Sequence, residues 1–241
     1  MQDDKTRTNI NIPDFQLNRV PHTIDDIVAN LGPKEQHRLS VILQEFVDGF
    51  AFIRKFPKSV TFFGSARFPE GNIHYEKARN VAREIVKNLG YAIVTGGGPG
   101  VMEGANRGAK DAKGKSVGLS IQLPEEQVVN PYVDESLSFY YFFVRKVVLS
   151  FSAEAFLFFP GGFGTFDELF EILTLIQTHK IPPVPVILVG RDYWKPIDKM
   201  IKSEMLKTHV TIDEQDTRLY TVTDDETEIL EIIKRAPLSR A

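Results

Sequence analysis

Hydrophobic side chains recur at helical spacing near the start of the chain. After a polar stretch with three prolines in residues 1–33, apolar residues return every three or four positions from Leu39 to Ile53. This period predicts an amphipathic helix over residues 34–56. Its apolar stripe should pack across the domain or extend a subunit interface, since it would otherwise be exposed. Residues 1–33 are expected to form an irregular arm.

Beyond this helix, short apolar runs alternate with helical stretches. Strands are predicted at residues 59–63, 91–95, 116–121, 137–140, 155–159, 184–189 and 219–222, and helices at 75–89, 99–110, 141–151, 165–178, 194–206 and 226–234. Apolar strands that alternate with helices are typical of a parallel sheet covered on both faces. The predicted fold is therefore α/β, a Rossmann-like doubly wound parallel sheet. It forms a single domain over residues 34–241, with an N-terminal helical extension.

Composition excludes several classes of protein. The 241 residues contain no cysteine, so disulfides, thiolate metal sites and cysteine nucleophiles are ruled out. No apolar run approaches the roughly 20 residues of a membrane helix, and the first residues lack a signal-peptide pattern. The net charge of −3 argues against a protein that coats nucleic acid. We expect a cytoplasmic protein with neither nucleic-acid nor membrane partners.

Three predicted strands run into unusual turns at their carboxyl ends, where open parallel sheets bind ligands. The turns are Gly64-Ser65-Ala66-Arg67, Gly96-Gly97-Gly98-Pro99-Gly100 and Pro160-Gly161-Gly162-Phe163-Gly164-Thr165. Glycine lets the backbone approach a ligand closely, and a helix that starts directly afterwards offers free N–H groups to an anion. We therefore predict a phosphate against residues 161–165, with the Thr165 hydroxyl as a further contact.

The alternative is that these glycines only make tight turns, because a lone glycine pattern is a weak motif. Two glycine loops between a strand and a helix weaken that alternative. The spacing matches neither the G-x-G-x-x-G of dinucleotide folds nor a Walker A loop, so NAD and ATP are not expected.

Arg145 and Lys146 are the only charges in the helix predicted at residues 141–151. This helix is apolar on nearly every face, so we expect it to be largely buried. A buried charge without a partner is costly, so Arg145 should meet a carboxylate or a phosphate. The alternative, in which the side chain extends to the surface, applies more readily to Lys146.

Glu168 has two interpretations. The segment Thr165-Phe-Asp-Glu168 fits a capping box, in which Glu168 closes the start of the helix. Alternatively, Glu168 faces the pocket one turn from the phosphate, where a carboxylate could orient water and stabilise a cationic sugar. Asp167 points about 100° away round the helix and is the weaker candidate. Glu103 is interpreted as a helix-start residue matched to the dipole. The five histidines lack metal-binding spacing, and no G-x-S-x-G elbow is present.

The stretch from Pro160 to Glu168 fits the motif PGGxGTxxE in full. With Arg145-Lys146 and the segment Gly96–Asn106, it resembles the LONELY GUY (LOG) family of cytokinin-activating phosphoribohydrolases, formerly labelled lysine decarboxylases. The resemblance covers about residues 60–177. The segments 130–133 and 141–146 are similar to the longer bacterial members.

The resemblance implies hydrolysis of the N-glycosidic bond of N6-modified AMP, or of AMP itself, to free base and ribose 5-phosphate. It implies no metal, no organic cofactor, and a homodimer or higher homo-oligomer with the site near the subunit interface. In that interpretation Arg145 also keeps Glu168 ionised. Residues 142–144 are Phe-Phe-Val where compact members carry a Met, so the base pocket is expected to differ. The expected catalytic residues are Arg145 and Glu168, and the expected substrate-binding residues are Gly64, Ser65, Gly96, Gly97, Gly98, Lys146, Gly161, Gly162, Gly164 and Thr165.

Two other functions compete with this one. A pyridoxal-dependent decarboxylase would need a Schiff-base lysine and a partner for the pyridine nitrogen. Lys146 could serve as that lysine, but nothing else in the sequence supports the function. A non-catalytic carrier or sensor, such as a nucleotide-binding or molybdenum-cofactor-binding protein, would use similar glycine loops. The pair Arg145 and Glu168 favours catalysis, because a carrier needs no carboxylate beside the sugar.

Overall fold

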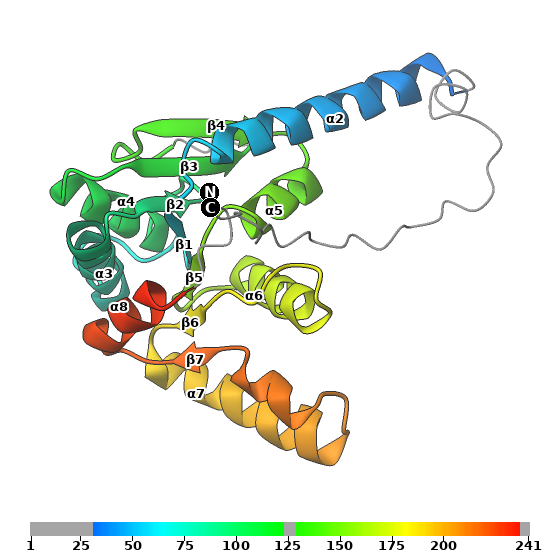
Figure 1. The fold of residues 1–241 in the computed structure, drawn as a ribbon. Coiled ribbons are helices and arrows are strands. Elements are labelled where there is room, and N and C mark those ends of the chain that lie inside the picture. The colour runs from blue at the N-terminus through cyan, green and yellow to red at the C-terminus, as the bar shows by residue number, and fades with distance from the viewer. Residues whose placement is uncertain (1–30, 123–128, 237–241) are drawn as a thin grey trace, which may run out of the picture. The chain divides into compact units, whose positions relative to one another are not determined.

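Seven parallel strands form one sheet in the computed structural model, which describes residues 31–122 and 129–236 (Figure 1). The strand order is β4-β3-β2-β1-β5-β6-β7, and every neighbouring pair is parallel. This confirms the predicted doubly wound α/β fold. The strands are β1 (Ser59–Phe63), β2 (Ala92–Thr95), β3 (Ser116–Ile121), β4 (Glu135–Phe139), β5 (Ala155–Phe158), β6 (Val186–Leu188) and β7 (Thr221–Val222).

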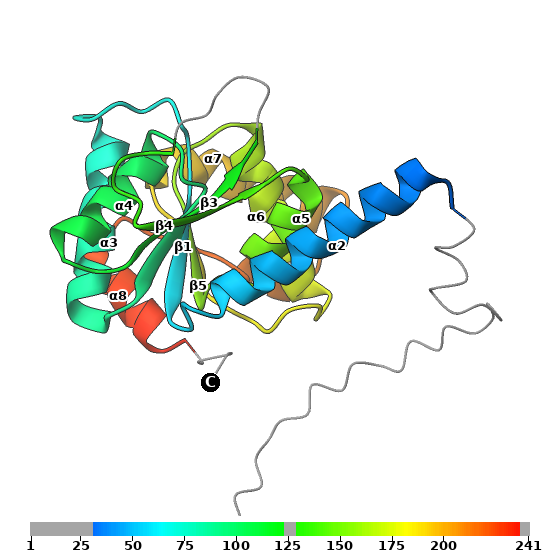
Figure 2. The ribbon, with the colours of Figure 1, turned by 90° about the horizontal axis from the view of Figure 1, so that it is seen from above.

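Helices cover both faces of this sheet. Helices α3, α4 and α8 lie on one face and α5 and α6 on the other, as Figure 2 shows. The π-helix η1 continues α7, and the short 3-10 helix η2 follows it. The helices are α2 (Pro33–Ile53), α3 (Ile73–Leu89), α4 (Val101–Asp111), α5 (Phe142–Ser150), α6 (Phe163–Gln177), α7 (Arg191–Met200), η1 (Ile201–Thr208), η2 (Glu214–Arg218) and α8 (Glu226–Lys234).

Alternation along the central strands divides the core into two layers. Successive side chains of a strand point to opposite faces. In β5, Phe156 and Phe158 join the layer under α5 and α6, whereas Ala155 and Leu157 join the layer under α3, α4 and α8. All four are fully buried. Because both faces are covered, these strands read as unbroken apolar runs in the sequence.

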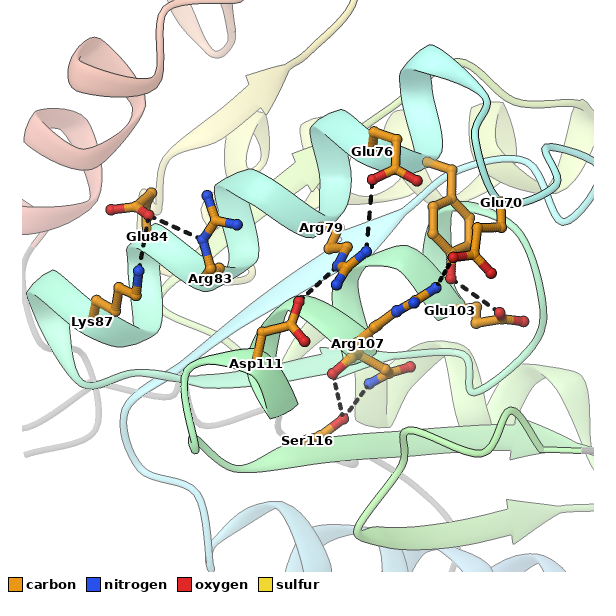
Figure 3. Close-up of polar contacts among 12 residues, drawn as sticks. Glu70, Glu76, Arg79, Arg83, Glu84, Lys87, Glu103, Arg107, Asp111 and Ser116 are labelled. Carbon is orange, nitrogen blue, oxygen red and sulfur yellow. Dashed lines mark hydrogen bonds and ion pairs between the residues drawn. The ribbon is translucent and has the colours of Figure 1, made fainter.

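α3 and α4 pack side by side on one face and are joined by polar contacts (Figure 3). Arg79 of α3 binds Asp111 of α4 at 2.6 Å, and the hydroxyl of Tyr75 donates to Glu103 at 3.0 Å. Glu103 lies in the first turn of α4, as predicted, and it also accepts this hydrogen bond from the neighbouring helix α3. Arg107 forms an ion pair with Glu70, in the loop that leads from β1 to α3.

The chain divides into two compact units, residues 1–41 and 42–241. Of the first unit the structure describes Leu31–Val41. The arm predicted for residues 1–33 lies outside the described residues except for its last three positions, and the boundary after residue 33 stays a prediction. From Ile42 onward, α2 packs on the domain, and Phe52 and Ile53 at its end belong to the core.

The predicted burial of the helix at residues 141–151 was wrong. α5 directs Val144, Val148 and Leu149 into the core, but the side chains of Phe142 and Phe143 are 55% and 47% exposed. A helix on a sheet presents one stripe to it, and an apolar sequence does not change that geometry. The outer face of α5 is therefore apolar and accessible in this chain.

Candidate active site

The carboxyl ends of β1, β2 and β5 surround a cavity of about 330 Å³. β1 and β5 are neighbours at the point where the strand order reverses, and open parallel sheets bind ligands at such a switch point. Phe142 and Arg145 of α5 form part of the wall, and Glu168 of α6 forms another part. The volume falls at the lower end of the range for small-molecule sites, roughly 300–1,000 Å³.

Most of the residues singled out in the sequence line this one cavity. Gly97, Gly98 and Gly161 do not line it. Gly97 and Gly98 are both buried, and their carbonyls accept hydrogen bonds from Asn130. The carbonyl of Gly161 accepts a hydrogen bond of 2.6 Å from the hydroxyl of Tyr193. Contact of these three glycines with a phosphate stays a prediction. The lining residues that were predicted are Gly64, Ser65, Gly96, Arg145, Lys146, Gly162, Gly164, Thr165 and Glu168.

Gly96 lies directly against the guanidinium of Arg145. A Cβ at this position would stand 2.5 Å from Nη2 of Arg145 and 2.9 Å from the sulfur of Met102. On its other side, Nε of Arg145 donates to the carbonyl of Leu119 at 2.7 Å. The guanidinium is thus fixed between β3 and the turn after β2. A side chain at position 96 would push it away.

Glu168 is buried, with 7% of its surface exposed, and its Oε2 has no hydrogen-bond partner among the described residues. Burial raises the pKa of Glu168 to about 7, and the positive charge of Arg145 only partly opposes this shift. Desolvation therefore outweighs the attraction of Arg145, which favours the ionised form of this carboxyl but does not restore its ordinary pKa. Burial likewise lowers the pKa of Arg145, against the attraction of Glu168.

The capping-box interpretation of Glu168 is contradicted. α6 begins at Phe163 rather than at Thr165, and its N-cap is Gly162, which forms no side-chain capping bond. Thr165 therefore lies inside the first turn and Glu168 in the second. A glycine at the N-cap leaves the N-terminal N–H groups of α6 without a side-chain cap, which suits an anion.

Lys146 is held by two carboxylates of α6. Its Nζ lies 2.8 Å from Asp167 and 3.2 Å from Glu171. Burial alone would lower the pKa of Lys146, but the hydrogen bonds to Asp167 and Glu171 outweigh that effect and raise it. The charged form is favoured, whereas a Schiff-base lysine must react as the neutral amine.

Several lining residues were not among the residues predicted for the site: Phe63, Ala66, Arg67, Met102, Phe142 and Asp167. Arg67 had a sequence signal, because it closes the turn after β1. Met102 and Phe142 had none, since an apolar residue in a helix is most simply part of the core. They reach the cavity only because the first turns of α4 and α5 meet there.

A larger cavity, of about 780 Å³, lies at the opposite ends of the strands, where they begin. It is formed where α3 and α4 end and β2 and β3 begin, and its described lining contains no carboxylate. Lysines near a helix C-terminus complement the partial negative charge of the exposed carbonyls. This explains the charges without a ligand. Its lysines are Lys55, Lys58, Lys113 and Lys115.

A model of the family described as "Possible lysine decarboxylase" matches residues 102–233, more than half of the chain. The chain belongs to this family, the LOG family. A LOG-related protein named cytokinin riboside 5′-monophosphate phosphoribohydrolase, from Rhodococcoides fascians, is 28% identical over 165 residues, which are 66% of this chain and 81% of that protein.

Solved structures of the same fold include the X-ray structure of TM1055, with a TM-score of 0.54 and 26% identity over 74% of this chain and 99% of that one. The molybdenum cofactor carrier protein of Chlamydomonas reinhardtii has a TM-score of 0.54 and 23% identity, over 74% of this chain and 97% of that one. At that identity the second likeness shows the fold alone. This chain, a member of the LOG family, therefore has the same fold as the molybdenum cofactor carrier protein.

Neither a membrane-spanning helix nor a metal cluster is found among the described residues. None of their helices has the length and apolar character to cross a membrane. No three or more of their His, Asp and Glu side chains gather in a way that could hold a metal ion.

Proposed function

We propose that this chain is a nucleoside 5′-monophosphate phosphoribohydrolase, which hydrolyses the N-glycosidic bond of AMP or an N6-modified AMP. One observation carries the proposal. The buried carboxyl of Glu168 and the guanidinium of Arg145 share a cavity where the turns after β1, β2 and β5 meet the uncapped start of α6. A phosphate site beside a desolvated carboxyl matches the chemistry named for the Rhodococcoides fascians relative.

In the proposed mechanism, the N-terminus of α6 and Thr165 hold the phosphate, and Gly162 and Gly164 let it approach closely. Binding energy of the phosphate then positions the ribose. The bond from C1′ to the base nitrogen breaks as the sugar gains oxocarbenium character. Water supplies its hydroxyl to C1′, and its proton passes through Glu168 toward the departing base.

Arg145 has an electrostatic role in this mechanism. Its guanidinium, fixed by Leu119 and Gly96, holds the anionic or ribosyl part of the substrate. It also lowers the energy of the ionised form of Glu168. The pKa near 7 suits a general base that exchanges protons at neutral pH.

The deciding experiment incubates the purified protein with AMP and, separately, with N6-isopentenyl-AMP, and follows free base by chromatography. Release of base from either substrate supports the proposal, and the ratio of the rates distinguishes cytokinin activation from AMP hydrolysis. If neither releases base while AMP still binds, a carrier or sensor is the better account. Co-purified pterin fluorescence would then favour a molybdenum-cofactor carrier.

Glu168→Gln is the matched variant, since it keeps the shape of the side chain and removes its charge. We expect turnover to fall by at least about 10²-fold, the usual contribution of a positioned general base. Calorimetry should show that AMP still binds. Near-normal turnover in the variant would contradict the role of the carboxylate.

We also propose that the chain acts as a homodimer or higher homo-oligomer. Tyr140, just before α5, and Phe142 and Phe143, in its first turn, are each at least 47% exposed. Exposed apolar patches of this kind mark association sites in soluble proteins. Because Phe142 also lines the cavity, such an interface would border the site.

A further inference from the structure

Asn130 lies outside the cavity yet is bonded to one of its walls. Its side chain is 5% exposed, and it precedes β4 in the chain. The amide nitrogen Nδ2 donates to the carbonyl of Gly98 at 2.9 Å and to that of Gly97 at 3.2 Å. The backbone N–H of Asn130 donates to the same Gly97 carbonyl at 2.8 Å. One residue thus satisfies two consecutive carbonyls of the turn after β2.

The network continues inward through two further buried residues. Nδ2 of Asn130 and the hydroxyl of Thr95 both donate to Oδ1 of Asn106, at 2.9 and 2.7 Å. The hydroxyl of Thr95 in turn accepts from the N–H of Gly97 at 2.9 Å. Asn106 is anchored to β3, because its Nδ2 donates to the hydroxyl of Ser116 at 2.9 Å. The amide orientations are consistent, because each donor meets an acceptor.

This network fixes the position of Gly96 relative to Arg145. Gly96 is flanked by Thr95, whose hydroxyl is in the network, and by Gly97, which is bonded on both its N–H and its carbonyl. A satisfied buried polar network is rigid, and breaking one member leaves the others unpaired. Nη2 of Arg145 stands 2.5 Å from where a Cβ on Gly96 would lie, so a shift of the turn toward Arg145 would displace the guanidinium.

We propose that Asn130 is a positioning residue, which holds the Gly96–Gly98 turn against Arg145 and so sets the separation of Arg145 and Glu168. The inference rests on the proposed function, because it assigns Asn130 a part in the same site. Asn106 and Asn130, the two asparagines of the network, are both buried, at 0% and 5% exposed.

Asn130→Asp is the sharpest test, since it keeps the size of the side chain and turns the Nδ2 donor into an acceptor. The new oxygen would face the carbonyls of Gly97 and Gly98 and repel them. Thr61→Val is the matched control. It breaks another buried hydrogen bond, that between Thr61 and Ser152 at 2.8 Å, and neither residue lines the cavity.

The expected result is a drop of at least about 10-fold in kcat/KM for Asn130→Asp, with kcat falling more than KM rises. The acidic limb of its pH–rate profile should move to higher pH, because Glu168 loses part of its counter-charge. Thr61→Val should lower Tm about as much as Asn130→Asp does. It should change neither kcat/KM nor the position of the acidic limb. The charged groups that act on Glu168 are Arg145 and Lys146 of α5, and Asp167 and Glu171 of α6.

Equal kinetics and pH profiles in the two variants would overturn the proposal. If Asn130→Asp does not fold, Asn130→Ala takes its place and is judged by the same criteria. If the wild-type chain cleaves no nucleotide, the proposed function fails, and the titration of ¹³C-labelled Glu168 followed by nuclear magnetic resonance decides instead. An upward shift in the Asn130 variant then supports positioning, and an unchanged titration refutes it.

Discussion

At the scale of single residues, Glu168 and Arg145 place opposite charges in a cavity wall that is shielded from water. Desolvation acts on both groups and disfavours each charged form, while their mutual attraction favours both. For Glu168 the desolvation is the stronger influence, so its pKa rises to about 7. A carboxyl that titrates near neutrality can exchange a proton with water, which an ordinary surface glutamate does poorly at that pH.

The first prediction at this scale concerns the pH dependence of turnover. The ionised carboxyl is the active form in the proposed mechanism, so kcat/KM should rise with pH and level off above about 7. Steady-state kinetics between about pH 5.5 and 8.5 would check this. AMP binding over the same range controls for ionisation of the substrate phosphate. A profile that is already flat from the acidic end of that range would contradict the assignment.

The second prediction concerns the free energy of unfolding. The folded-state pKa of Glu168 is raised, so its contribution favours the folded state at low pH and is lost as pH rises from about 4.5 through about 7. A glutamine at this position would stay neutral, so Glu168→Gln should be more stable than wild type at about pH 8, by on the order of 2–3 kcal/mol. The two proteins should be nearly equal at about pH 5. Urea unfolding at both pH values measures the difference, and a pH-independent difference would contradict the buried ionisation.

At the scale of elements, the approach to α6 shows how a short turn builds an anion site. The N–H of Ser65 donates to the carbonyl of Pro160, which ties the turn after β1 to the turn after β5. Tyr193 of α7 holds the next carbonyl, that of Gly161. α6 therefore begins from a backbone that is bonded on both sides, and its first N–H groups are directed by that framework.

The third prediction compares two adjacent glycines of this turn. A Cβ at Gly161 would clash with Oγ1 of Thr165, whereas a Cβ at Gly162 would meet no described atom within 4 Å. Gly161→Ala should therefore displace Thr165, weaken AMP binding by about 10-fold or more, and lower Tm. Gly162→Ala should keep the wild-type Tm. Calorimetry and thermal unfolding would measure both, and equal behaviour of the two variants would count against this geometry.

At the scale of the whole molecule, the sheet separates two apolar layers, and an aromatic surface on α5 lies outside both. The layers meet through the central strands, whose side chains alternate between them. The outer face of α5 belongs to neither layer, and Phe142 and Phe143 lie there. The proposed association of chains would cover this surface.

The fourth prediction tests that association. Phe143→Asp places a charge on the exposed face of α5 without touching the cavity lining, so it should convert the oligomer to monomer in light scattering coupled to size exclusion. Val210→Asp is the control, because Val210 is 74% exposed in the turn after η1. It should leave the assembly unchanged. An unchanged mass for Phe143→Asp would place the interface elsewhere.

Much of this molecule follows from local sequence. The unbroken apolar runs specified a parallel sheet because strands buried on both faces have no polar side. The predicted helix at residues 75–89 ends before Gly90, as observed. The glycine turns lie at the carboxyl ends of β1, β2 and β5, so most of the predicted site residues line one cavity. Each of these features depends on residues close together in the chain.

Only the tertiary structure decided the rest. α5 packs on the sheet through one stripe only, so its nearly continuous apolar sequence wrongly predicted that the whole helix is buried. The capping box at Thr165 failed because α6 starts two residues earlier, on a backbone held by distant residues. The protonation of Glu168 depends on how far the fold shields it from water. The position of the turn after β2, which contacts Arg145, depends on Asn130, a residue that precedes β4 and bonds that turn. The periodicity of a sequence indicates which side of an element is apolar. It does not indicate which other elements pack against that side.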